Sequence, residues 1–405
     1  MKEYFPGVPA AVYEGSYASH PFAFRYYEPE RIIAGKPMRE HLRFALPFGA
    51  AARFGYHGTD YLMAAMELMH KLGLQYYIAS DRQLAPDSNS LRESNAGLDE
   101  AVDALRCIQD AYGLRALQMS ADLSSHPRYS YGAATSYSAD VFAFAAAQTK
   151  KALEAAQRLG AEFFCFSGEQ EQRDGFYLSV NDALESENLV RMLGLVAAYA
   201  TEIGYAGNLC VRPSGQDSPQ AYWQGALQAL HFLRGSNLES CYSVDLPGGA
   251  QSMDLRALLQ ADRLGSIYTD AAASGYYNFF AFTTPVMFEL LRAGGSRRGG
   301  IILEIPERRG CVTPEDFVLS CIYHMDAYAY GLLIAQRILL DGRVEQFRRE
   351  RYSNYAYGLG KAILENQVDI QILEDHALQK GEIKAYTART EYLNHVQQGL
   401  LCRGV

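Results

Sequence analysis

The sequence predicts an α/β fold, a (β/α)8 barrel in which eight parallel strands are each followed by a helix. After residue 40, short apolar runs alternate with longer amphipathic stretches. Such alternation is typical of βαβ units and a parallel sheet, and eight units are the number that closes a barrel. An open doubly wound sheet is the alternative, but no GxGxxG follows an early strand, so its dinucleotide-binding form has no support. The eight apolar runs span 42–48, 74–81, 115–122, 162–168, 208–213, 240–246, 264–269 and 299–305.

Helical spacing of apolar residues fills the intervals between these runs, in stretches that include 60–72, 98–112, 141–159, 186–203 and 253–263. The last barrel helix is predicted over 314–340, because Pro314 and the two acids after it suit the first turn of a helix. Beyond Gly342 the chain keeps helical patterns and many charges but has no strand run. We therefore expect three regions, namely an N-terminal lead-in (1–40), the barrel (41–342) and a C-terminal helical arm (343–405).

The bulk composition excludes several classes of protein. A net charge of −9 argues against nucleic-acid binding, which needs a basic surface to neutralise phosphates. The seven Cys form no CxxC or finger spacing, which indicates free thiols in a reducing compartment. The N-terminus has no apolar signal core, and no apolar run approaches the length of a membrane span. The sequence thus predicts a cytoplasmic protein that binds neither nucleic acid nor membrane.

Several short segments, taken in order and spacing, resemble the xylose isomerases. The resemblance implies an aldose–ketose isomerase that converts D-xylose to D-xylulose with two divalent ions (Mg²⁺, Mn²⁺ or Co²⁺). It also implies a dimer or tetramer, with the arm serving oligomerisation. The segments are Tyr13–Ser16, Phe22–Arg25, Glu40–Ala45, Pro127–Tyr129, Gly132–Thr135, Leu264–Ile267, Ala293–Gly295, Gly299–Gly300, Arg308–Arg309, Arg351–Tyr352, and Arg389 with Glu391.

The metal cage that the resemblance implies is largely replaced. Two hard cations need several carboxylates at the C-terminal ends of the strands. The family has a Glu-Pro-Lys-Pro run at strand five, and we align its metal-binding Glu with Val211 and its Lys with Pro213. Strands six and eight keep an acid each, Asp245 and Glu304. The other cage positions carry no acid and hold Gly248, Tyr268, Asn278 and Phe280, while Pro306 stands at the position of a second Lys.

Asp245 and Glu304 are therefore candidates for a residual metal pair. Two carboxylates can hold one ion weakly, with water completing the shell, but not a bridged pair of ions. The alternative is that both are ordinary solvated acids at strand ends. In either case we expect no tightly bound metal cofactor.

The groups that would handle the sugar are replaced as well. Ala50 stands at the family's imidazole position after strand one, and Phe166 is aligned with the Trp that floors the pocket. Ser80 and Gln83 replace a His and an Asp that act together in ring opening; a hydroxyl does not exchange protons near neutral pH as an imidazole does. The intervening Asp81 is retained, and it could simply cap the following loop.

Two further groups of side chains allow either a structural or a functional interpretation. The acids around Glu169 and Glu171 could offer new catalytic groups or belong to a polar loop. An aromatic group could form a sugar-stacking floor or fill the space of the metals; its members are Tyr268, Tyr276, Tyr277, Phe279, Phe280 and Phe282.

Three functional hypotheses follow, in order of preference. The first is a weakened or non-catalytic paralogue that binds a sugar or a partner subunit, as a homo-oligomer or together with an intact homologue. The second is an enzyme with altered, single-metal or metal-independent chemistry on a carbohydrate. The third is ordinary xylose isomerase activity. A fold does not by itself decide among them.

Overall fold

A computed structural model describes residues 2–171, 180–214, 220–249, 252–269, 279–295, 298–305, 313–383 and 389–401. Its centre is a closed barrel of eight parallel strands, in which the last strand pairs with the first. The predicted (β/α)8 barrel is therefore confirmed, and the open sheet is excluded. The barrel strands are β5 (Phe44–Pro47), β6 (Tyr76–Ser80), β7 (Arg115–Ser120), β8 (Phe163–Ser167), β9 (Asn208–Arg212), β10 (Tyr242–Leu246), β11 (Leu264–Tyr268) and β12 (Ile301–Ile302).

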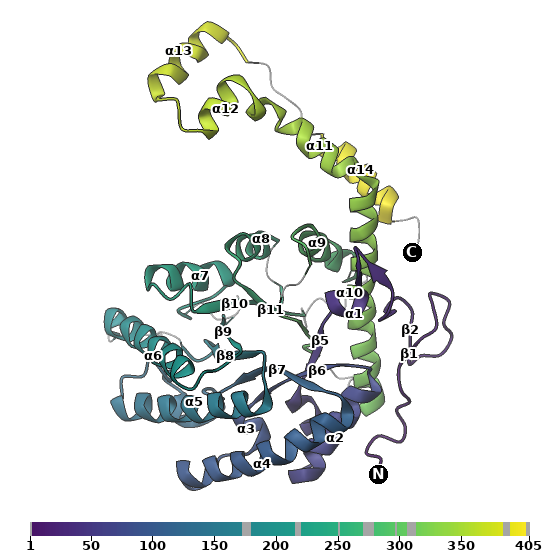
Figure 1. Cartoon of the computed structure of the whole chain (residues 1–405), viewed down its shortest axis with the longest axis vertical. Coiled ribbons are helices and arrows are strands. Elements are labelled where there is room, and N and C mark those ends of the chain that lie inside the picture. Colours follow the sequence, from purple (N-terminus) through teal and green to yellow (C-terminus); the bar gives the residue numbers. More distant parts are fainter. Residues whose placement is uncertain are drawn as a thin grey trace.

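Helices cover the outside of the barrel (Figure 1). Three of them begin at a side-chain cap, where Ser90, Ser138 and Thr313 each accept a backbone N–H. The main helices are α2 (Gly58–Lys71), α4 (Leu91–Tyr112), α5 (Ala139–Leu159), α6 (Asp182–Glu202), α7 (Ala226–Gly235), α8 (Ser252–Ala261), α9 (Phe279–Arg292) and α10 (Pro314–Asp341), with short helices α1 (Met38–His41) and α3 (Asp81–Leu84).

Side chains along each barrel strand alternate between the helix layer and the barrel interior, as strand geometry requires. On β8, Phe164 and Phe166 join the main core between strands and helices, whereas Phe163 and Cys165 belong to a separate interior cluster with Cys210. Ala45, Leu117, Tyr268 and Ile302 form a second interior cluster. This alternation, or parity, of side chains along a strand decides which residues at the strand ends can contact a bound molecule.

The N-terminal lead-in is tied to the barrel helices by two buried carboxylates. Asp326 on α10 accepts the backbone N–H groups of residues 25, 26 and 27 at 2.8–2.9 Å. Glu67 on α2 accepts those of Tyr4 and Phe5 at 2.8 and 3.0 Å. Short ladders within the lead-in join β1 (Val12–Tyr13) to β2 (Ala23–Phe24), and β3 (Ile32–Ile33) to β4 (Lys36–Pro37).

Helix α10 is, by length and composition alone, apolar enough to cross a membrane, which the search for apolar runs in the sequence did not find. However, 78% of its most apolar window is buried inside the protein. It packs along α9 and carries core residues such as Phe317 and Met325. Its apolar composition therefore reflects a core position rather than contact with lipid.

The helices after Gly342 leave the barrel as an extended arm (Figure 1). They are α11 (Arg343–Arg351), α12 (Gly358–Leu364), α13 (Ile370–Lys380) and α14 (Thr390–Leu401). Helix α14 returns to α10, where Val396 and Leu400 pack against Ile334 and Ile338. Helices α12 and α13 contain no buried residue.

Candidate functional site

An arginine-centred cluster lies at the mouth of the barrel, where the C-terminal ends of the strands meet. Arg212 at the end of β9 places Nη2 2.6 Å from Glu169 Oε1 and 3.2 Å from Glu304 Oε1. Its guanidinium carbon lies 4.4 Å from the centre of the Tyr268 ring, a cation–π distance. We call Arg212, Glu169, Glu304 and Tyr268 the mouth cluster. It brings together four elements that are far apart in the sequence.

The electrostatics of the mouth cluster keep Arg212 charged. Burial by itself lowers the pKa of Arg212, but Tyr268, Glu169 and Glu304 together raise that pKa above its ordinary value. The guanidinium side chain is 29% exposed, so one edge of it faces the mouth. A molecule entering the barrel would therefore meet a permanent cation held between two carboxylates.

Asp245 is the second acid retained at a strand end, and it lies fully buried. Its Oδ1 accepts the backbone N–H of Ser266 at 2.8 Å, and its Oδ2 accepts Gln118 Nε2 at 3.1 Å. The same Gln118 nitrogen lies 3.0 Å from the Tyr268 hydroxyl, which links Asp245 to the mouth cluster. Burial raises the pKa of Asp245 to about 6.

The predicted metal pair of Asp245 and Glu304 does not form a shared ligand group among the described residues. Glu304 pairs with Arg212, while Asp245 lies in a group with two Cys. A divalent pair would need carboxylates turned toward a common centre, and here a guanidinium stands between the two acids of the mouth. The residues present do not fit the family's two-metal cage.

Neighbouring side chains at the end of β9 lie in different surroundings. Val211 packs in the core between strands and helices, so it cannot face a ligand, and Arg212 is the residue at the end of β9 that points into the barrel. The end of β9 thus brings a cation to the barrel mouth.

The same alternation places neighbouring side chains of β8 on opposite faces. Phe166 lies in the core on the helix side of β8 and cannot floor a pocket inside the barrel. The next residue, Ser167, is the one with interior parity, and its Oγ accepts the backbone N–H of Glu169 at 3.4 Å. The expected aromatic floor at this strand is therefore absent from the described part of β8.

Ser80 and Gln83 are engaged in starting a helix. The Ser80 hydroxyl accepts the backbone N–H of Gln83 at 3.3 Å, and Gln83 Oε1 accepts that of Ser80 at 3.1 Å. This reciprocal pair is a capping box at the start of α3. Ala50 is buried in a 3₁₀ helix over Phe48–Phe54 and offers no polar group.

Asp81 ties two loops together, which agrees with its interpretation as a capping residue. Its Oδ1 accepts the backbone N–H groups of Arg82 and Asp122, both at 2.8 Å, and Oδ2 accepts Gln148 Nε2 at 3.0 Å. Glu171 is similarly buried, accepting three successive backbone N–H groups from Ala133 to Thr135. Of the two described acids near residue 170, Glu169 and not Glu171 therefore belongs to the mouth cluster.

Several positions in the predicted site lie outside the described residues: Tyr276, Tyr277, Asn278, Pro306, and the side chains of Phe279, Phe280 and Phe282. Gly248 is described and follows β10 in a turn. The residue that the sequence analysis missed is Arg212. A cation directly after the apolar run Leu209–Val211 was the available signal, because charged residues rarely end a buried strand without a partner.

A closed parallel barrel with polar side chains gathered at its C-terminal mouth defines the class of TIM-barrel proteins whose ligands bind at that face. Among solved structures, an L-ribulose 3-epimerase matches with a TM-score of 0.54 and 15% identity, covering 74% of this chain and 97% of that one. That likeness supports the fold.

Sequence comparison identifies the family. The xylose isomerase of Geobacillus thermodenitrificans is 36% identical, covering 96% of this chain and 95% of the relative. That of Thermotoga maritima is 32% identical, covering 100% and 99%. Residues 348–396 match the model of the XylA2 C-terminal domain. The chain belongs to the xylose isomerase family.

The buried Asp81 predicts a specific pH dependence of stability. Burial raises its pKa from 3.8 to about 6, so the folded state binds this proton more tightly than the unfolded chain. The bound proton on Asp81 stabilises the folded state by at most ~3 kcal/mol. This stabilisation is fully present below about pH 4 and is lost as the pH rises through 6.

Asp81→Asn should remove this dependence. We expect the free energy of unfolding of the wild type, minus that of the variant, to fall between pH 4 and pH 7 in urea titrations. Asp110→Asn, at an exposed position on α4, is the control and should show no such trend. A difference that rises with pH would show that the three donors to Asp81 outweigh its burial.

Proposed function

We propose that this protein is a member of the xylose isomerase family that has exchanged the two-metal centre for an arginine. It binds a sugar at the barrel mouth and is a weakened or non-catalytic paralogue of the isomerases. The observation that carries the proposal is the Arg212 guanidinium held between Glu169 and Glu304. Family membership supports the sugar as the ligand class.

Electrostatics weigh against a divalent ion in the mouth cluster. A dication about 4 Å from a guanidinium is repelled by on the order of 8 kcal/mol at an effective dielectric constant of about 20. Glu169 and Glu304 would attract the ion, but both already neutralise Arg212. Binding a metal there would require the arginine to leave its ring and its two carboxylates.

A guanidinium suits a sugar in a different way. Its planar set of N–H donors can bind hydroxyl and carbonyl oxygens, while Glu169 and Glu304 can accept from sugar hydroxyls. These contacts give recognition without the electrophilic strength of two metal ions. A hydride shift between sugar carbons needs that electrophile. We therefore expect the protein to bind a sugar but to catalyse the isomerisation weakly or not at all.

Metal-independent carbohydrate chemistry is the second candidate function. It is favoured by one observation, the 40% exposed Glu169 side chain next to a cation. A carboxylate in that place could remove a proton beside a carbonyl group that Arg212 polarises. This chemistry would move a proton through solvent-exchangeable groups, whereas a hydride shift would not.

The purified protein should not convert D-xylose to D-xylulose at a rate near that of its relatives with Mg²⁺, Mn²⁺ or Co²⁺. Because several groups that act as a unit are replaced, we expect a deficit of at least ~10⁴-fold. An intact isomerase assayed in parallel is the control. Robust metal-dependent turnover would contradict the proposal, whereas metal-independent exchange of deuterium from solvent into a sugar would favour the second candidate.

Sugar binding should depend on Arg212. We expect calorimetry with D-xylose to show binding to the wild type that is weakened ~10–100-fold in Arg212→Ala, the loss of one or two charge-assisted hydrogen bonds. Arg115→Ala is the matched control, since Arg115 is exposed at the opposite end of a barrel strand. Equal binding by the wild type and Arg212→Ala would place any sugar site elsewhere.

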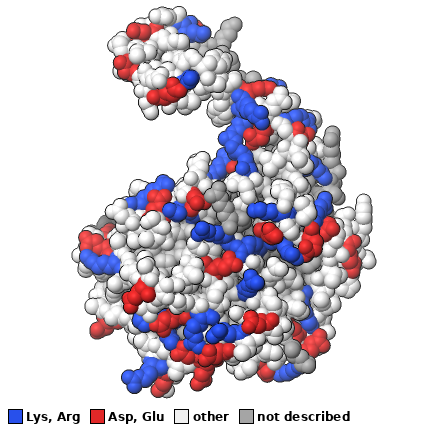
Figure 2. Space-filling model, in the orientation of Figure 1, with Lys and Arg blue, Asp and Glu red and all other residues white. Residues whose placement is uncertain are grey.

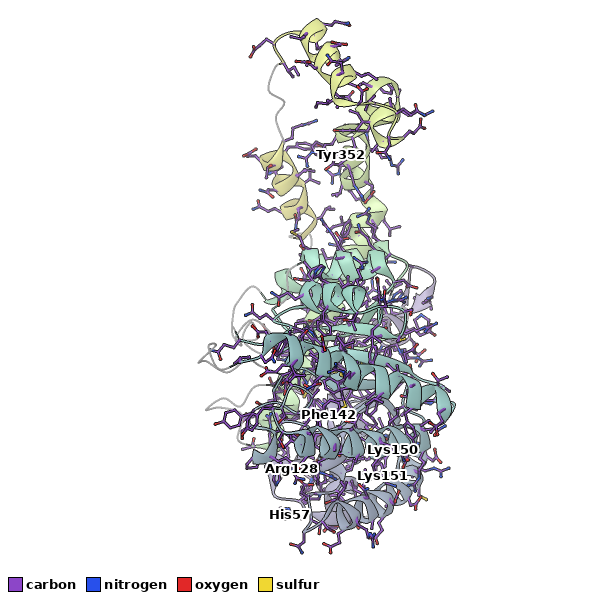
Figure 3. All side chains as sticks on the ribbon, turned by 90° about the vertical axis from the view of Figure 1, so that its left-hand side faces the viewer. His57, Arg128, Phe142, Lys150, Lys151 and Tyr352 are labelled. Carbon is purple, nitrogen blue, oxygen red and sulfur yellow. The ribbon has the colours of Figure 1, made fainter. Side chains whose placement is uncertain are left out.

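The arm supplies the expected contact with a partner subunit, which we propose is a second copy of this chain or an intact homologue. Apolar side chains stand exposed along it, among them Leu364 (65%), Ile370 (83%) and Leu378 (76%). In a view turned by 90°, Tyr352 on the arm lies away from the part of the barrel that carries Lys150 and Lys151 (Figure 3). Exposed apolar surface of this kind favours association.

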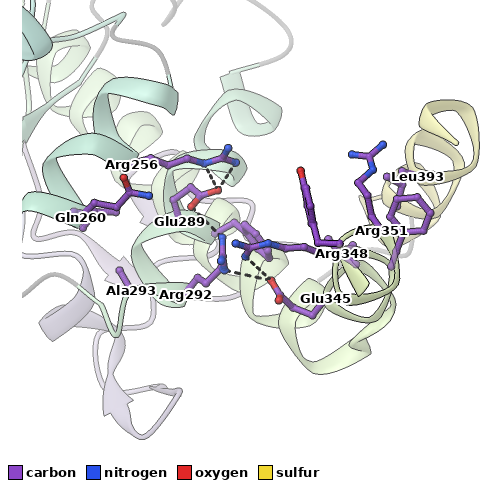
Figure 4. A pocket seen from close by; sticks show the side chains of 14 residues that line it. Arg256, Gln260, Glu289, Arg292, Ala293, Glu345, Arg348, Arg351 and Leu393 are labelled. Carbon is purple, nitrogen blue, oxygen red and sulfur yellow. Dashed lines mark hydrogen bonds and ion pairs between the residues drawn. The ribbon is translucent and has the colours of Figure 1, made fainter. Parts of the chain in front are cut away.

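Charged side chains orient the arm where it leaves the barrel. Figure 2 shows basic side chains gathered at this junction, which holds a groove of about 790 Å³ between α8, α9, α11 and α14. Arg292 bridges Glu289 on α9, at 3.7 Å, and Glu345 on α11, at 3.3 Å (Figure 4). The start of the arm is thus fixed against the barrel by the ion pairs of Arg292 and by the packing of α14 on α10.

The full-length protein should therefore sediment as a dimer or larger. Deleting 343–405 should reduce the number of subunits in the assembly. The paired change of Ile370 and Leu378 to Asp should do the same, because charges buried in an apolar interface are left without partners. The matched control changes the neighbouring Gln371 and Gln379 to Asp, which adds the same charge at exposed polar positions of α13. A monomeric wild type would show this prediction to be wrong. A cytoplasmic location remains a prediction as well.

A further inference from the structure

Three potential metal ligands meet inside the barrel, beside the mouth cluster and apart from it. Cys165 of β8, Cys210 of β9 and Asp245 of β10 are all buried, and their ligand atoms lie within 4.8 Å of one another. The two Cys are register partners on neighbouring strands, so their side chains share one face. Asp245 Oδ2 is 3.6 Å from Cys165 Sγ and 3.9 Å from Cys210 Sγ.

The two oxygen–sulfur separations are close to the edges of a tetrahedral zinc site. Zn–S bonds of about 2.3 Å and Zn–O bonds of about 2.0 Å at tetrahedral angles put neighbouring ligand atoms roughly 3.5–3.8 Å apart. An ion could therefore enter among the three atoms with small adjustments of the side chains. Thiolates also select zinc and similar soft ions over Mg²⁺ and Mn²⁺.

The surroundings hold the carboxylate in the orientation that a ligand needs. Ser266 N–H binds Asp245 Oδ1, which leaves Oδ2 turned toward the two sulfur atoms. Gly265 makes this possible, because a Cβ there would collide with Oδ1. Partners of this kind, one layer outside the ligands, fix the geometry of metal sites.

A fourth donor is present beside the group. The Gln118 side chain is 3% exposed, and its amide nitrogen binds Asp245 Oδ2. The oxygen of the same amide is buried with no hydrogen-bond partner among the described residues. A buried acceptor without a partner is costly, and a metal ion is one way to satisfy it. A register shift in the pairing of β7 with β6 at this point lets both Leu117 and Gln118 face the interior.

We infer that Cys165, Cys210 and Asp245 form a binding site for one Zn²⁺ ion, with Gln118 Oε1 as the fourth ligand. Binding replaces two S–H bonds by two Zn–S bonds and releases two protons, with no change of oxidation state. The charge of the buried group is unchanged, since one dication replaces two protons. The site needs no sugar and no isomerase activity, so it stands or falls independently of the proposed function.

Cobalt(II) provides the direct test, because it occupies zinc sites and reports thiolate ligands through charge-transfer absorption in the near ultraviolet. The full-length protein, refolded with a thiol reductant and chelator and then dialysed, should bind one equivalent of Co²⁺ with that absorption. One equivalent of Zn²⁺ should then displace it. Zn²⁺ should also raise the melting temperature, while equal Mg²⁺ should not.

The double change of Cys165 and Cys210 to Ser should abolish the thiolate absorption. The matched control changes the exposed Cys107 and Cys241 to Ser and should retain it. If the site variant does not fold, the wild-type titration still decides the matter. The inference is overturned if the wild type binds no Co²⁺ or Zn²⁺, binds Co²⁺ without thiolate absorption, or loses that absorption only in the control.

Discussion

The pairing of the Arg212 guanidinium with Glu169 and Glu304, over the ring of Tyr268, is the interaction on which the account of this protein depends. A buried or half-buried charge persists only where other groups compensate it. Here two carboxylates and an aromatic face compensate one cation at the barrel mouth. One cation lies between two carboxylates, so the mouth cluster has a formal net charge of −1 without an ion.

The barrel makes this pairing possible because separate strands carry the four groups. Glu169 follows β8, Arg212 ends β9, Tyr268 ends β11 and Glu304 follows β12. The outer faces of the same strands pack against helices and are unaffected by what the inner faces hold. A change of charge at one strand end can therefore be compensated by a residue at another strand end while the fold is preserved. This is the usual way in which one barrel supports different chemistries.

The fold was predictable from the sequence, because eight short apolar runs of strand length alternate with stretches of helical spacing. The site was predictable only in part. Asp245 and Glu304 were recognisable as acids at strand ends, but a strand buried on both faces has no apolar–polar alternation to reveal its parity. Whether Val211 or Arg212 faces inward was therefore invisible before the structure.

Other features of the site depend on contacts between distant segments. The shifted register at Leu117, the approach of Glu169 to Arg212 and the meeting of Cys165 with Cys210 follow from barrel closure, not from local spacing. The capping box of Ser80 and Gln83, by contrast, has a local Ser-x-x-Gln signature that predicts the start of a helix. The resemblance to the family had instead suggested that these two positions handle the sugar.

The most direct test of the central claim is the binding of Mn²⁺ at the barrel mouth, measured by electron paramagnetic resonance of the free ion. The account predicts no binding to the wild type in the micromolar range. It predicts measurable binding to Arg212→Glu, where a third carboxylate joins Glu169 and Glu304, and none to Arg212→Gln, which removes the cation without adding a ligand. Tight binding of Mn²⁺ to the wild type that is abolished by Glu304→Gln would contradict the account.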